Sequence, residues 1–186
     1  MNLKPDSKFT PEQARKQLGD SSRALSLLTA SMVYDEPSLF GVFVELSLMD
    51  EKFYAERASR VVSICSHSFP EMFRPYCAGI ISELKNLRSE DAIRNLLKTL
   101  AEVPVKLSKK DKSVLLNLCF DYLVSKAYPV AVHVFSMQIL YNLSREIPEI
   151  GEELRCILEE RIPDSSAGYR SRARRILSQM NKDRLQ

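Results

Sequence analysis

The side chains best suited to chemistry are few in this sequence. The chain of 186 residues contains two histidines, four cysteines and no tryptophan. His133 lies within VAVHVFSM, where apolar neighbours favour a partly buried structural role. His67 lies near the end of a predicted helix, in CSHSFP, where it can interact with the last helical carbonyls. Neither histidine is therefore expected to act as a catalytic base.

A zinc site is the first alternative to consider for the cysteines. Cys65, His67 and Cys77 have suitable side chains, but Cys-x-His followed by a distant cysteine matches no structural-zinc spacing. Cys119 and Cys156 fall on apolar stripes of predicted helices, the usual place for a free thiol. We expect neither a metal site nor a cofactor.

Other catalytic signatures are missing as well. The sequence has no GxxxxGK[ST], GxGxxG or GxSxG motif, so it predicts neither a phosphate-binding loop nor a nucleophile elbow. The carboxylate pairs Glu152–Glu153 and Glu159–Glu160 alternate with apolar residues and are predicted to lie on a solvated helix face. With five glycines, the chain also has no segment resembling the signature loop of the all-helical fumarase superfamily. The sequence therefore predicts a protein that is not an enzyme.

Arginines are the remaining candidates, and several of them cluster in GYRSRARRILSQMNKDR, residues 168–184. The clustered side chains are Arg170, Arg172, Arg174 and Arg175. Such a strip can contact phosphates, or it can form the polar outer face of a terminal helix. Tyr54, Tyr128 and Tyr169 stand at helix starts and are predicted to pack there rather than to stack on bases.

The elements that position these residues are predicted to be helices throughout. A first helix is opened by the capping box Thr10–Gln13 and ended by Gly19. Start and stop signals predict the others at 21–33, 38–48, 51–68, 71–86, 90–103, 109–126, 129–147, 149–162 and 167–181. Because the connections are short, consecutive helices are expected to be antiparallel neighbours.

Four of these helices repeat one pattern, in ERASRVV, EDAIRNL, VFSMQIL and SRARRIL. The third position is small in each: Ala58, Ala92, Ser136 and Ala173. Two residues later stands a long polar side chain: Arg60, Arg94, Gln138 or Arg175. In three units a proline follows the small residue at the same distance: Pro70, Pro104 and Pro148. The units recur after 34, 44 and 37 residues, the period of a two-helix repeat in which small residues allow close helix packing.

This pattern resembles the HEAT/armadillo-like helical repeat superfamily. Asp50 with Arg57, and Asp164 with Arg172, stand where HEAT repeats carry an Asp in the turn and an Arg in the second helix. The resemblance implies an all-α fold, a right-handed α-α superhelix of about five antiparallel helix pairs. We expect a single domain over 1–186, with a capping helix pair at 1–36, four HEAT-like units at 37–181 and a tail at 182–186.

The resemblance further implies a non-catalytic scaffold or adaptor that binds a protein or peptide on its concave face. Arg60, Arg94, Gln138 and Arg175 are the candidate contact residues because they share one repeat position. The alternative is a nucleic-acid-binding repeat protein resembling the DNA-alkylation-repeat glycosylases, with Arg170, Arg172, Arg174 and Arg175 on phosphates. Against both, the arginines of the pattern can simply pair with glutamates on adjacent helices, such as Glu56 or Glu90.

The sequence also bears on location. The first residues, MNLKPDSKFTPEQ, lack the apolar core of a secretory signal, and no apolar run is long enough to span a bilayer. We therefore expect a cytoplasmic protein with reduced thiols and no membrane partner.

Overall fold

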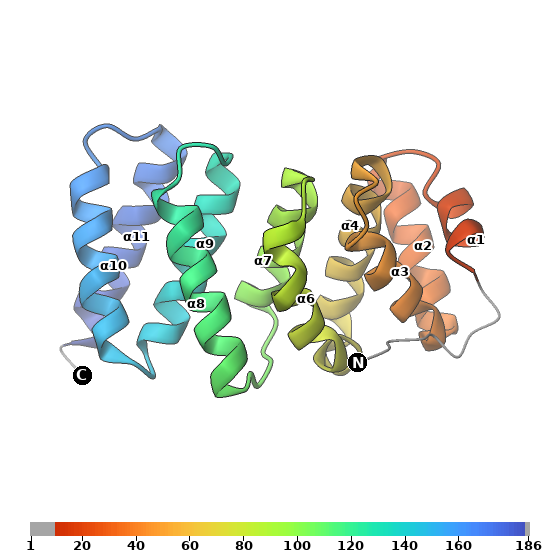
Figure 1. Ribbon diagram of the computed structural model, residues 1–186, viewed down its shortest axis with the longest axis horizontal. Helices are drawn as coiled ribbons and strands as arrows, with labels where there is room; N and C mark the ends of the chain where they lie inside the picture. The colour runs from red at the N-terminus through yellow and green to blue at the C-terminus, as the bar shows by residue number, and fades with distance from the viewer. Residues whose placement is uncertain (1–9, 185–186) are drawn as a thin grey trace. The chain divides into compact units, whose positions relative to one another are not determined.

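The computed structural model describes residues 10–184, in which every regular element is a helix (Figure 1). These residues form two compact units, and the boundary along the chain falls between Leu107 and Ser108. The first unit contains α1 (Pro11–Gln17), α2 (Arg23–Asp35), α3 (Phe40–Ser47), α4 (Lys52–Ser68), α5 (Pro70–Phe73), α6 (Cys77–Glu83) and α7 (Glu90–Glu102). The second contains α8 (Lys109–Val124), α9 (Val130–Ser144), α10 (Pro148–Arg161) and α11 (Ala167–Asp183).

Each unit has two layers of helices. In the first, α4 packs against α2, α3 and α7, and Figure 1 shows α3 and α6 in front of α4 and α7. In the second, α9 packs against α8, α10 and α11, and α8 and α10 form the front layer. The rear layers therefore hold the helices that carry the repeated pattern.

Local signals determine where most of these helices begin. The predicted capping box is present, since Thr10 accepts from the Gln13 amide and Gln13 accepts from the Thr10 amide. Serines cap α2, α7, α8 and α11 by accepting from the backbone three residues ahead. The helix predicted at 71–86 is broken instead into α5, a 3₁₀ turn, α6 and a second 3₁₀ turn. Pro75 lies in the first of these turns, where its ring and missing N–H prevent a continuous helix.

The repeated pattern is confirmed in the core. Its small residues Ala58, Ala92, Ser136 and Ala173 are all fully buried, at 0% exposure. The apolar residues four positions on are buried in three units, whereas Leu177 is half-buried and its neighbour Ile176 takes the buried place. The small side chains thus lie in the packed interior of each unit, as the pattern predicted.

Two expectations about burial are wrong. The spacing of Leu25, Leu28 and Met32 puts them on one face of α2, which predicts a core face, yet Leu28 is 61% exposed. The buried face is instead Ser26, Thr29, Ala30 and Val33. Its smaller side chains allow α2 to approach α4, and the Thr29 hydroxyl donates to the Leu25 carbonyl at 2.8 Å. Cys156 is exposed rather than buried on its helix, because Leu154 and Leu158 form the buried face of α10.

Two expectations about the domain organisation and the superhelix are not tested by the structure of the two separate units. The single domain and the right-handed superhelix stay predictions. The predicted tail begins inside α11, which continues to Asp183, and residues 185–186 lie outside the described range, as do residues 1–9. Among the described helices, none is both long and apolar enough to cross a membrane.

Candidate functional site

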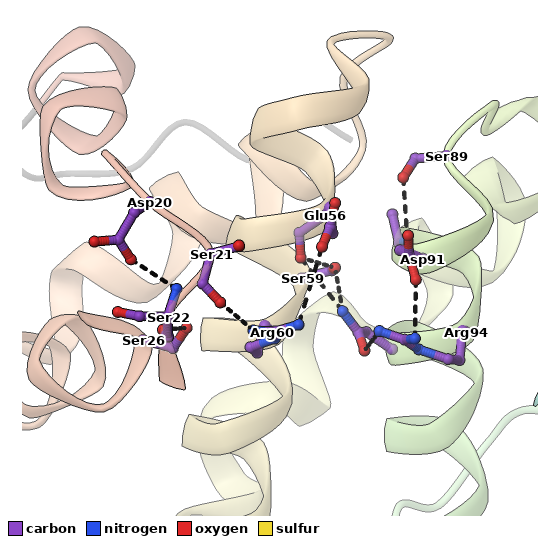
Figure 2. Close-up of polar contacts among 12 residues, drawn as sticks. Asp20, Ser21, Ser22, Ser26, Glu56, Ser59, Arg60, Ser89, Asp91 and Arg94 are labelled. Atoms are coloured by element: carbon purple, nitrogen blue, oxygen red, sulfur yellow. Dashed lines mark hydrogen bonds and ion pairs between the residues drawn. The ribbon is translucent and has the colours of Figure 1, made fainter. Parts of the chain in front are cut away.

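A row of polar groups runs from the connection before α2 across α4 to α7 in the first unit (Figure 2). We call it the polar seam. It comprises Ser21, Glu56, Ser59, Arg60, Asp91, Arg94 and Asn95. Two of the four residues singled out by the repeat, Arg60 and Arg94, belong to it.

Arg60 joins α4 to the connection that precedes α2. Its Nη1 donates to the Ser21 carbonyl at 2.6 Å, and its Nη2 lies 3.9 Å from a carboxylate oxygen of Glu56. About a third of the side chain is exposed, at 32%. The connection is itself ordered by Asp20, which accepts from the Ser22 amide at 2.6 Å. Hydrogen bonds from Ser22 lower the pKa of Asp20.

Arg94 occupies the corresponding place on α7. Its Nη1 lies 2.9 Å from the carboxylate of Asp91, and its Nη2 donates to the Asn95 side chain at 3.3 Å. The acid that pairs with Arg94 is thus Asp91, one turn earlier on the same helix, and not Glu90 as the sequence suggested. The Arg94 side chain is 33% exposed, so part of its guanidinium faces solvent.

Asn95 connects the two arginine positions, although sequence reasoning missed it. Its Nδ2 donates to the Ser59 hydroxyl at 3.0 Å and to the Glu56 carbonyl at 3.3 Å, both on α4. The other three units place Val61, Ile139 and Ile176 at this buried position. A polar residue at a repeat position that is otherwise β-branched and apolar was the signal that could have revealed it.

The other two candidates lie in the second unit. Gln138 on α9 accepts from Nη1 of Arg172 on α11 at 3.1 Å and donates to Asn142 at 2.9 Å. The residue that contacts Gln138 is therefore Arg172, about one turn before Arg175 in α11. Arg175 itself is exposed. A ladder of all four residues across both units stays a prediction.

The C-terminal arginines divide into two pairs. Arg170 donates to the Ser165 carbonyl and Arg172 to Gln138, and both are half-buried. Arg174 and Arg175 are exposed, and neither makes an ion pair within residues 10–184. The acidic helix α10 pairs with the end of α11, through Glu152 with Arg184.

His67 has the helix-end role that the sequence suggested. Its Nδ1 lies 2.7 Å from the Ser63 carbonyl oxygen, and its Nε2 lies 3.0 Å from a carboxylate oxygen of Glu102 on α7. Cys65 and Cys77 are buried. Within residues 10–184, no three His, Cys, Asp or Glu side chains are grouped so that they could hold a metal ion.

His133 is buried, as expected, and its Nε2 donates to the Ser125 carbonyl at 3.0 Å. Burial lowers the pKa of His133, and the nearby Arg161 adds to the effect, whereas the hydrogen bond to Ser125 opposes it. His133 also lines a cavity of the second unit together with Tyr169. The imidazole is therefore neutral near pH 7 and is held in place on one side by a backbone acceptor.

Layered helices, with a small buried residue at one repeated position and hydrogen bonds between neighbouring pattern helices within each unit, define an α-helical repeat protein. The chain matches the family model described as HEAT repeat domain over residues 22–180, and it belongs to that family. The predicted resemblance and the all-α fold are thus confirmed. Comparison with curated proteins gives no match, and comparison with solved structures gives none either.

Proposed function

We propose that this protein is a non-catalytic scaffold that binds a protein or peptide across the polar seam. HEAT repeat proteins are helical-repeat scaffolds that often bind other proteins. The observation that carries the proposal is the pair of half-buried guanidinium groups on α4 and α7, joined through Asn95. Because their neighbours already orient them, little conformational entropy is lost when a partner binds.

The charges of the seam favour a polypeptide over a polyanion. Each arginine has an acid on its own helix, Glu56 for Arg60 and Asp91 for Arg94. Positive and negative groups therefore alternate along the row, which suits the mixed donors and acceptors of a peptide. A phosphate backbone would require a surface of one sign. No bond is made or broken in this mechanism, and the cytoplasmic location remains part of the proposal.

Affinity capture with matched variants tests this function. The full chain is immobilised, and the proteins it retains from an extract of its native cells are quantified by mass spectrometry. The double variant Arg60→Ala/Arg94→Ala should lose most of the specifically retained protein. The control Arg74→Ala/Lys85→Ala removes two exposed cations of the first unit outside the seam and should retain it. Equal retention by both double variants would exclude the seam as the binding surface.

Nucleic-acid binding is a second candidate, favoured by Arg174 and Arg175, which are exposed and form no ion pair with any residue of the described range 10–184. Fluorescence anisotropy with duplex DNA at increasing salt tests it. If both side chains contact phosphates, Arg174→Ala/Arg175→Ala should reduce the slope of log K against log salt by about 1.8. A wild-type chain that does not bind DNA at low salt would eliminate this candidate.

A further inference from the structure

The front layer of the first unit contains a cavity of about 350 Å³, to which α3, the 3₁₀ turn before α6 and the end of α6 contribute (Figure 1). Its volume lies at the lower end of the range of ligand sites, about 300–1,000 Å³, and suits one long side chain. None of its residues belongs to the polar seam, so the cavity has no part in the function proposed above. The lining includes Val44, Glu45, Leu48, Met49, Tyr76 and Glu83.

The charged groups that line this cavity are acids only. Glu45 on α3 and Glu83 at the end of α6 are both exposed, and neither forms an ion pair within the described part of the chain. Glu83 accepts one hydrogen bond, from the Asn86 amide at 2.9 Å, which leaves its charge uncompensated. Arg15 reaches the sulfur of a lining methionine at 3.6 Å but already pairs with an acid outside the cavity. The cavity therefore favours a cation.

The remaining side chains of the lining indicate what kind of cation fits. Val44 is buried, whereas Leu48 and Met49 are half-buried and offer an aliphatic surface to a ligand. Tyr76 is half-buried as well, and its ring packs edge to face on Phe40 with centroids 5.5 Å apart. Burial raises the pKa of Tyr76, so the phenol stays neutral and its oxygen can accept a hydrogen bond. An apolar stem that ends in a positive charge matches this lining.

We propose that this cavity binds a lysine side chain presented by a partner protein. The four-carbon stem of the lysine lies against Leu48 and Met49. Its ammonium group has three donors, and the lining supplies three acceptor groups, the carboxylates of Glu45 and Glu83 and the hydroxyl of Tyr76. An arginine fits less well, because its planar fork pairs best with a single carboxylate, whereas these two carboxylates come from different helices.

The test is an NMR titration of the full chain labelled with ¹³C at the methionine methyl groups. Met49 lines the cavity and reports on it, and a Met49→Leu variant assigns its signal. Three probes are compared: acetyl-Gly-Lys-Gly-amide, the same peptide with an acetylated lysine, and acetyl-Gly-Arg-Gly-amide. We expect a saturable shift of the Met49 methyl signal with the lysine peptide, weaker binding of the arginine peptide and no shift with the acetylated one. The affinity for the lysine peptide should fall as the NaCl concentration rises.

Variants make the assignment specific. Glu45→Gln/Glu83→Gln should weaken binding of the lysine peptide about fivefold or more, since both negative charges are lost while the shape is kept. The control Glu12→Gln/Glu71→Gln makes the same change in net charge at two exposed acids of the first unit outside the cavity, and should leave binding unchanged. Tyr76→Phe should weaken binding about threefold, because one acceptor is lost. The Tm of each variant without peptide shows whether it is folded.

The proposal is overturned by any of four results. These are the absence of a saturable Met49 shift with the lysine peptide, an equal shift with the acetylated peptide, an arginine peptide that binds as tightly, and equal affinities in the two double variants. If the cavity double variant does not fold, the single changes Glu45→Gln and Glu83→Gln replace it in the comparison. Because the seam variants change other residues, these results are independent of the capture experiment.

Discussion

Replacing Asn95 with alanine tests whether the polar seam stabilises the packing of α7 against α4. The change removes both hydrogen bonds that the Asn95 amide donates to α4, at 3.0 and 3.3 Å. The Ser59 hydroxyl still donates to the Glu56 carbonyl at 2.8 Å, so neither α4 group loses all its partners. The side chain that is removed is 8% exposed, so its packing is lost too.

The expected loss follows from these contacts. Two hydrogen bonds contribute about 1 kcal/mol each. The higher helix propensity of alanine raises the free energy of unfolding by about 0.5 kcal/mol. The packing lost with the asparagine side chain lowers it by a similar amount. We therefore expect the free energy of unfolding of the first unit to fall by about 2 kcal/mol. With a urea m-value of about 2 kcal/mol/M, the midpoint should fall by about 1 M.

Urea denaturation followed by far-UV circular dichroism measures this shift. Asn86→Ala is the matched control, because Asn86 is exposed and bonds only locally to Glu83, so its midpoint should barely move. A double-mutant cycle with Ser59→Ala should show coupling between Asn95 and Ser59. The reasoning fails if Asn95→Ala behaves like the control or if the two changes are strictly additive.

Three further predictions concern other parts of the chain. A Cβ at Gly41 would lie 2.7 Å from the Tyr76 hydroxyl oxygen but 3.4 Å from Cζ, the ring atom that carries it. Gly41→Ala should therefore lower the Tm of the wild type, but not that of Tyr76→Phe. Thermal unfolding of the wild type, both single variants and the double variant measures this difference. Burial lowers the pKa of His133 from 6.5, so the free energy of unfolding should fall as the pH drops below about 6.5. In urea denaturation at pH 7 and pH 5, the difference between the two pH values should be smaller for His133→Gln than for the wild type. With Ellman's reagent at pH 8, the exposed Cys156 should react in the native protein, whereas Cys65, whose pKa burial raises to about 12, should react only after unfolding; rapid reaction in a Cys156→Ser variant would contradict the observed burial.

Much of the local structure could be predicted from the sequence. Serine N-caps and proline breaks act through the nearest backbone groups, so the helix starts at Pro11 and Glu90 follow from a few adjacent residues. The small residues of the repeat were recognisable for a similar reason. Close helix packing requires a small side chain at the same place in every unit, and Ala58 and Ala92 are indeed fully buried.

The contacts between helices were decided by the tertiary structure alone. The sequence of α2 offers two faces that could be buried, one apolar and one made of small residues. The face with Thr29 packs against α4, and Leu28 on the apolar face is exposed. Likewise, the spacing of Arg94 indicated a shared repeat position, but not that Asn95 would link it to α4. The Tyr169 hydroxyl, which is buried and has no hydrogen-bond partner within residues 10–184, likewise results from packing that the sequence did not indicate. The sequence by itself therefore determined where most helices begin and end, because caps and proline breaks depend on neighbouring residues. Which faces and hydrogen bonds join the helices depends on residues that are distant along the chain, and only folding brings them together.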